Sequence, residues 1–228
     1  MPKPEPYRPH ISSQFDGALR SLREKVLMMS ALTERTLGNA QTGLIEHDVD
    51  HCNRAIADDA EIDILEREIS AEATNLILRF QPVALDLRIV VVSIKISVNL
   101  ERIADQAVAI ARRARKLQHM TAMPDAGTLS SLFTDSARFQ RQVIDSFLNN
   151  EALSPNYLQN AHSRLMRKAK EYGDFVTKTI PYENEEKVNA LLELMYIAKL
   201  LEQIADLCRD IGADTQYAFN PEFRLGGE

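Results

Sequence analysis

Two acidic pairs in this sequence have a spacing that suits metal binding. Glu101 and Asp105 lie four residues apart in the segment LERIAD, and Glu202 and Asp206 repeat the pair in LEQIAD. Residues four apart on an α-helix share one face. Two carboxylates so placed can offer oxygen ligands to one ion, and hard divalent metals prefer oxygen. Asp210 comes four residues after Asp206, so we expect it to extend the second row.

The segment DDAEIDILE supplies a further acidic face ahead of the first pair. Asp59, Asp63 and Glu66 fall on one side of the helix expected here. If this helix packs antiparallel against the helix that carries Glu101 and Asp105, carboxylates from both helices surround one point. That arrangement predicts a metal site between the two helices.

Acidic residues four apart are also common on helix faces that contact only water. Their repulsion is small in an isolated helix, and Arg102, Arg112 and Arg113 are near enough in sequence to balance the charge. The recurrence of the pair at the same place in two similar segments favours a functional role. Spacing alone leaves both interpretations open.

Amphipathic helices are predicted almost throughout the chain, because apolar residues recur at spacings of three and four. Pro82 and Pro181 each stop one helix and favour the start of the next. The stretch TAMPDAGT divides the chain nearly in half and is the best linker. The predicted helices span residues 12–47, 48–79, 83–118, 125–150, 155–179 and 183–218.

The two halves of the chain resemble each other. LERIADQAVAIA, from Leu100, and LEQIADLCRDIG, from Leu201, match at six of twelve positions with a constant offset of 101. We therefore predict an all-α fold of six helices, built as two tandem three-helix bundles with an internal pseudo-two-fold. The expected parts are a disordered lead-in (1–11), a first repeat (12–120), a linker (121–127), a second repeat (128–219) and a flexible tail (220–228).

The helix around LERIAD is expected to be apolar on two sides. Ile94, Val98 and Val108 point more than a third of a turn away from the stripe that suits the bundle core. A helix that is apolar on two sides is usually packed from two sides, so the second side should face the other repeat or a partner. The core stripe contains Ile96, Leu100, Ile103, Ala107 and Ile110.

Composition excludes several classes of protein. The net charge of −6 argues against non-specific nucleic-acid binding, which depends on Lys and Arg neutralising phosphates. Two cysteines, Cys52 and Cys208, fit a reducing compartment. The longest apolar run is far shorter than the roughly 20 residues of a membrane span, and the proline-rich start has no apolar stretch typical of a signal peptide. We expect a cytoplasmic protein that reaches membranes only through partners.

Catalytic motifs are missing from the sequence. It contains no HExxH, no Glu-x-x-His of di-iron bundles, no Walker A motif, no GxGxxG and no GxSxG. Hydrolase functions therefore have no support in the sequence.

The chain resembles the PhoU family over nearly its whole length. HISSQFDGALRSLREKVLMMSALTERTL is similar to the first helix of that family, IADDAEIDILEREI to the second, and QPVALDLRIVVVSIKISVNLERIADQAVAIARRA to the third. The combination of QPxxxDLR with LERI(G/A)D is far more specific than a single ExxxD. The resemblance implies a metal cluster, with iron, zinc, manganese or magnesium as the candidate ions. Carried over by position, it implicates Asp59, Asp63, Glu101 and Asp105.

The second repeat departs from the family pattern. Aligning the halves places His162 and Met166 where Asp59 and Asp63 stand, while Glu202, Asp206 and Asp210 remain. We expect a second metal site to be lost, weakened or rebuilt with His162. If metal binds, the first repeat should hold it better.

The resemblance also implies a regulatory function, and it leads us to predict that the protein is not an enzyme. It predicts a regulator of phosphate homeostasis that restrains the phosphate-starvation response and modulates phosphate ABC transport. The expected partners are the ATPase subunit of the transporter and a sensor histidine kinase, and we expect a homodimer. The alternatives are a carboxylate-bridged metalloenzyme, which the missing Glu-x-x-His pairs disfavour, and a metal-free helical scaffold.

Overall fold

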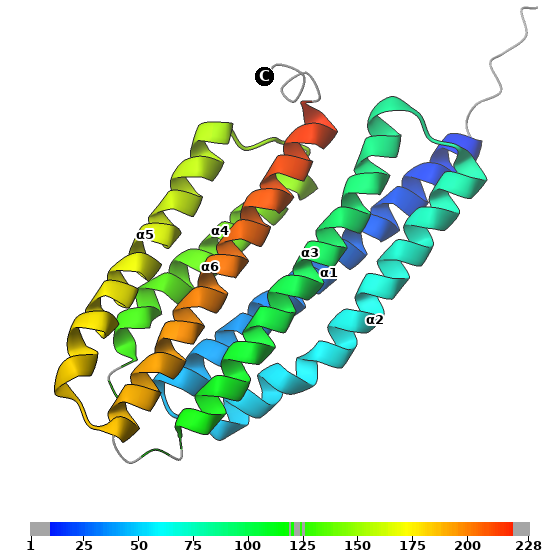
Figure 1. The fold of residues 1–228 in the computed structure, drawn as a ribbon. Coiled ribbons are helices and arrows are strands. Elements are labelled where there is room, and N and C mark those ends of the chain that lie inside the picture. The colour runs from blue at the N-terminus through cyan, green and yellow to red at the C-terminus, as the bar shows by residue number, and fades with distance from the viewer. Residues whose placement is uncertain (1–9, 119, 121–123, 125, 221–228) are drawn as a thin grey trace, which may run out of the picture.

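The chain folds into long α-helices (Figure 1). The computed structural model describes residues 10–118, 120, 124 and 126–220, and within them it has six α-helices, two short 3-10 turns and no strand. The helices are α1 (His10–Ile45), α2 (Val49–Phe80), α3 (Ala84–Leu117), α4 (Ser130–Leu148), α5 (Pro155–Thr179) and α6 (Glu185–Phe219). The 3-10 turns are η1 (Gly127–Leu129) and η2 (Ile180–Tyr182).

The helices form two three-helix bundles that lie side by side, as the internal repeat predicts. Helices α1 to α3 make the first bundle and α4 to α6 the second. In Figure 1, α3 and α6 run next to each other along the middle of the molecule, with α2 at one edge and α5 at the other. The bundles meet where α3 packs on α6 and α1 packs on α4.

Two contacts between α3 and α6 reveal the internal two-fold. Lys95 Nζ donates a hydrogen bond to Asp214 Oδ1 at 2.6 Å. Near the other end of the pair, the Arg113 guanidinium lies 4.5 Å from the centroid of the Tyr196 ring, and Arg113 also forms an ion pair with Glu193. Lys95 corresponds to Tyr196, and Arg113 to Asp214, at the offset of 101. The two contacts therefore exchange under the two-fold, and the sequence offset agrees with the geometry.

Local sequence signals set the ends of several helices. The Asp48 side chain accepts hydrogen bonds from the backbone N–H groups of the first turn of α2, and Ser154 and Asn184 cap α5 and α6 in the same way. These caps satisfy N–H groups that have no partner within the helix. At the other end of α2, Gln81 takes a left-handed conformation with φ 47°, and Pro82 follows, so α3 begins as a separate helix.

The helix boundaries differ from the prediction mainly at α4. The predicted helix starts at 125, whereas α4 starts at Ser130 because η1 occupies the preceding residues. Helix α1 starts at His10, two residues before the predicted start. Parts of the predicted lead-in (1–9), linker (121–123 and 125) and tail (221–228) lie outside the described residues.

The core stripe predicted on α3 is completely buried, and each of its five residues has an exposed fraction of 0%. Burial along the second apolar side of α3 is less uniform than expected. Val108 is buried, whereas Val98 is 41% exposed and lines a groove with Ile94 between α3 and α6. No helix in the described part of the chain has a segment long and apolar enough to cross a bilayer.

The burial of Leu100 leads to a stability prediction. Because its side chain is fully buried, Leu100→Ala should lower the free energy of unfolding by about 2–5 kcal/mol. Val98→Ala, at a half-exposed position of the same helix, should change it by less than about 1 kcal/mol. Urea unfolding followed by circular dichroism measures both values, and equal losses would contradict the assignment of the core.

Candidate functional site

The carboxylates predicted in the first repeat do lie near one another, on the facing sides of α2 and α3. Partial burial raises the pKa of Asp59, and the negative charges of Asp105 and Asp63 raise it further. Burial is also the main cause that raises the pKa of Glu101, and Asp105, Asp63 and Glu66 add to the effect. Carboxylates from both helices therefore form one electrostatic cluster, which we call the α2–α3 acidic face: Asp59, Asp63, Glu66, Glu101 and Asp105.

Nearby cations leave the α2–α3 acidic face largely uncompensated. Arg35 contacts Asp58 rather than Asp59, at 2.8 Å, and Arg113 contacts Glu193 on α6. The charge of Arg112 lowers the pKa of Asp59 and so opposes the effect of burial. Within the described residues, however, Arg112 forms no ion pair with any carboxylate. Among the described residues, Arg112 therefore relieves the repulsion of these carboxylates only in part.

The donor set of the α2–α3 acidic face fits a hard metal ion by its chemistry. It offers several carboxylate oxygens that are partly desolvated and repel each other, and such a set favours a divalent cation. Its arrangement is open, because within the described residues no three His, Cys, Asp or Glu side chains converge closely enough to hold an ion. Binding would therefore need the carboxylates to turn toward a common point.

In the second repeat, a histidine and two basic side chains contact the acidic residues at the equivalent place. His162 is buried and its Nε2 lies 2.8 Å from Asp206 Oδ1, in the position that Asp59 occupies opposite Asp105. Arg209 lies 3.4 Å from the same oxygen of Asp206, and Lys199 forms an ion pair with Glu202. In this repeat, side chains of the protein therefore contact the carboxylates of Glu202 and Asp206 directly.

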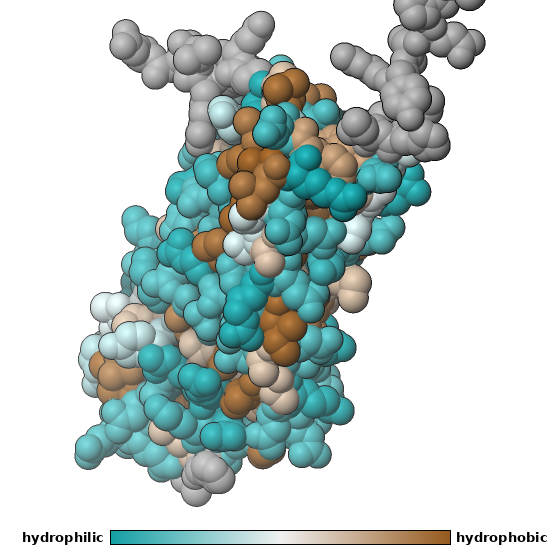
Figure 2. All heavy atoms as spheres, turned by 90° about the vertical axis from the view of Figure 1, so that its right-hand side faces the viewer, coloured by the Kyte–Doolittle hydropathy of each residue, from teal (hydrophilic) through white to brown (hydrophobic). Residues whose placement is uncertain are grey.

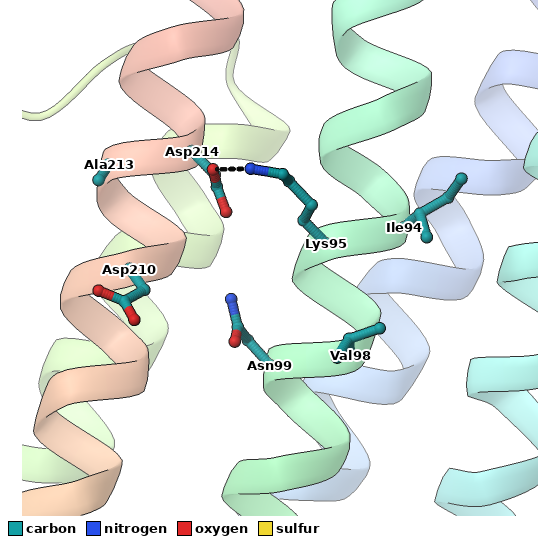
Figure 3. Close-up of a pocket in the computed structure, with 7 residues that line it drawn as sticks. All are labelled: Ile94, Lys95, Val98, Asn99, Asp210, Ala213 and Asp214. Carbon is teal, nitrogen blue, oxygen red and sulfur yellow. Dashed lines mark hydrogen bonds and ion pairs between the residues drawn. The ribbon is translucent and has the colours of Figure 1, made fainter. Parts of the chain in front are cut away.

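Asp210 and Asp206 face different neighbouring helices. Figure 3 shows it beside a groove of about 410 Å³ between α3 and α6, where Lys95 and Asn99 point from α3 toward α6. A step of four residues overshoots one helical turn by about 40°, so the row from Glu202 to Asp210 winds around α6. Asp206 contacts His162 on α5, whereas Asp210 lines the groove next to α3. Arg209 lies between the two carboxylates, 3.4 Å from Asp206 and 3.6 Å from Asp210.

An exposed apolar patch lies at the turn between α2 and α3, and the sequence analysis did not identify it. Leu78 and Val83 are 72% and 74% exposed, and Leu85 is also exposed. Figure 2 shows hydrophobic residues gathered at this end of the molecule. Apolar residues on both sides of Pro82 were a signal for this patch, since a turn cannot bury them all.

The fold and the acidic motifs define an all-helical protein made of two PhoU-like repeats. The family model described as PhoU domain matches residues 26–114. The phosphate-specific transport system accessory protein PhoU of Edwardsiella tarda is 30% identical over 211 residues, which cover 89% of this chain and 83% of the relative. The protein of the same name from Escherichia coli (strain K12) is 30% identical over 204 residues, with the same coverage of both chains. The chain belongs to the PhoU family.

Two crystal structures share this fold. PhoU from Pseudomonas aeruginosa superimposes with a TM-score of 0.84 at 25% identity, over 90% of this chain and 98% of that one. The phosphate transport system regulatory protein PhoU from Streptococcus pneumoniae gives a TM-score of 0.78 at 20% identity, over 91% and 97% of the two chains. The six-helix architecture is thus that of the family.

The raised pKa of Glu101 predicts how stability depends on pH. The folded protein binds this proton more tightly than the unfolded chain, so ionisation of Glu101 lowers stability as pH rises through the raised pKa. Glu101→Gln should therefore raise the melting temperature at pH 7 in the presence of a chelator. The gain should shrink toward about pH 4, where the wild-type carboxyl also becomes neutral.

The matched control is Glu202→Gln, at the equivalent position of the second repeat. Because Glu202 is paired with Lys199, its removal should not stabilise the protein. The melting temperatures of both variants and of the wild type, measured at pH 7 and at about pH 4, test this prediction. A gain of the same size in both variants would show that the two acidic motifs have the same electrostatic environment.

Proposed function

We propose that this chain is a cytoplasmic accessory and regulatory protein of a phosphate transport system. The observation that carries the proposal is the 30% identity, over 89% of this chain, to proteins named as phosphate-specific transport system accessory protein PhoU. In this proposal the protein acts by docking and not by catalysis. It restrains the phosphate-starvation response when phosphate is plentiful. Its partners are the ATPase subunit of the phosphate ABC transporter and a sensor histidine kinase, and it works as a homodimer.

We further propose that the α2–α3 acidic face binds a metal ion, with Asp59, Asp63, Glu101 and Asp105 as ligands. The support is the environment of these carboxylates: burial first, and then the charges of their neighbours, raise the pKa of Asp59 and Glu101. A di- or trivalent ion such as iron, zinc, manganese or magnesium would neutralise this repulsion and tie α2 to α3. In the second repeat, the ion pairs of Glu202, Asp206 and Asp210 take the place of the metal.

Loss of the protein should leave phosphate-starvation genes active in phosphate-rich medium, because the restraint is gone. The measurement is a starvation-promoter reporter in a deletion strain, with the wild-type gene returned as the control. A pull-down from phosphate-replete cells should recover the transporter ATPase and the kinase. An unchanged reporter in a strain without a close paralogue would contradict the proposal.

Metal should bind to the first repeat in preference to the second. After reconstitution and removal of excess metal, Asp63→Asn/Asp105→Asn should lose most of the bound metal and the rise in melting temperature that the metal gives. Asp206→Asn/Asp210→Asn should keep both. Elemental analysis and thermal melts measure the two effects.

A gain-of-function variant sharpens this comparison. His162→Asp/Met166→Asp/Arg209→Ala places carboxylates where the first repeat has them and removes a competing cation, so it should raise the metal content above that of the wild type. Equal losses from the two double variants would refute the asymmetry. A wild-type protein that retains no metal would show that the acidic face is only solvated.

A further inference from the structure

One carboxylate between α4 and α5 is contacted by three cations. Asp135 on α4 is only 6% exposed. Its Oδ2 lies 2.7 Å from Lys168 Nζ and 3.5 Å from Arg164 Nε, and its Oδ1 lies 3.2 Å from an Arg138 terminal nitrogen. Asp135 can balance one of these charges. The cation cluster of Arg138, Arg164 and Lys168 therefore keeps a surplus of positive charge around a buried base.

The equivalent helix pair of the first repeat has the opposite balance. Between α1 and α2, Lys25 Nζ lies 2.9 Å from Glu68 and 3.1 Å from Glu72, so two carboxylates share one cation. Arg35 lies 2.8 Å from Asp58 and also near a second carboxylate of α2. A surplus of cations is thus a property of the α4–α5 face and not a general result of packing these helices.

The cation cluster has hydrogen-bond donors that do not contact Asp135. A guanidinium group has five N–H donors. Arg138 uses one terminal nitrogen at Asp135, and Arg164 approaches Asp135 through Nε, so its two terminal nitrogens lie outside this contact. The side chains of Arg138 and Arg164 are 54% and 44% exposed. Asp135 therefore holds the cations close together while leaving donors open to a ligand.

We propose that Arg138, Arg164 and Lys168 form a binding site for a small multivalent oxoanion such as inorganic phosphate. Arginine binds such anions through two parallel hydrogen bonds. An anion with several charged oxygens can bridge both arginines, which a single chloride ion cannot do. Glu171, which follows Lys168 by three residues, is the nearest further carboxylate along α5, and the cluster keeps a net positive charge even when Glu171 is counted. The inference is independent of the proposed regulatory function.

Calorimetric titration with inorganic phosphate at low ionic strength tests the site. The wild-type protein should bind phosphate saturably with one equivalent, while chloride at matched ionic strength should give no saturable signal. Arg164→Gln should weaken binding about tenfold, since it removes charge-assisted hydrogen bonds. Arg167→Gln is the matched control, because Arg167 is exposed on the same helix but is not one of the cations at Asp135. It should bind like the wild type.

Asp135→Asn should have the opposite effect to Arg164→Gln, because it removes the carboxylate and not a cation. Without its carboxylate the cations repel each other, so the variant should melt at a lower temperature and gain more from added phosphate than the wild type does. If this variant does not fold, Arg138→Gln takes its place and should weaken phosphate binding as Arg164→Gln does. Equal weakening by Arg164→Gln and Arg167→Gln, an equal response to chloride, or no saturable binding by the wild type would each overturn the proposal.

Discussion

The packing of α3 against α6 is the contact on which the rest of the structure depends. Each of these helices completes the core of its own repeat and also meets the other repeat, so each is buried along two sides. Leu100 and Leu201, which are equivalent in the two repeats, are both completely buried. Polar residues of α3 and α6 are thereby confined to the narrow strips that remain, and the acidic motifs lie on those strips. The outer helices also differ in charge between the repeats, since α2 is acidic and α5 is basic.

The sequence predicts most of this fold, because its signals are local and periodic. Apolar spacing and the breaks at Pro82 and Pro181 place six helices close to their observed positions. The offset of 101 predicts the two-fold that the exchanged contacts of Lys95 and Arg113 reveal. The late start of α4 was missed, because the three residues of η1 have no periodic pattern. The burial of Val108 alongside the exposure of Val98 was also missed, since it depends on where α6 crosses α3.

The candidate site was predictable only in part. Its carboxylates follow from spacing and resemblance, and their mutual effect on pKa agrees with two facing helices. The cations that occupy the second repeat were harder to foresee. Lys199 and Arg209 are three residues from their partners, a local signal that could have been used. The cluster around Asp135 combines residues of two helices, so only their packing in three dimensions reveals it.

The exchanged contacts at the two ends of the α3–α6 pair also decide which helices can associate. In a homotypic pair of two α3 helices from different chains, Lys95 would meet Arg113 of the second copy at both ends, and two positive charges would repel. In a homotypic pair of two α6 helices, Tyr196 would meet Asp214, and the cation would be missing. Each repeat therefore discriminates against a copy of itself in favour of the other repeat. At these two contacts, the halves of the internal duplication are therefore complementary to each other and not to themselves.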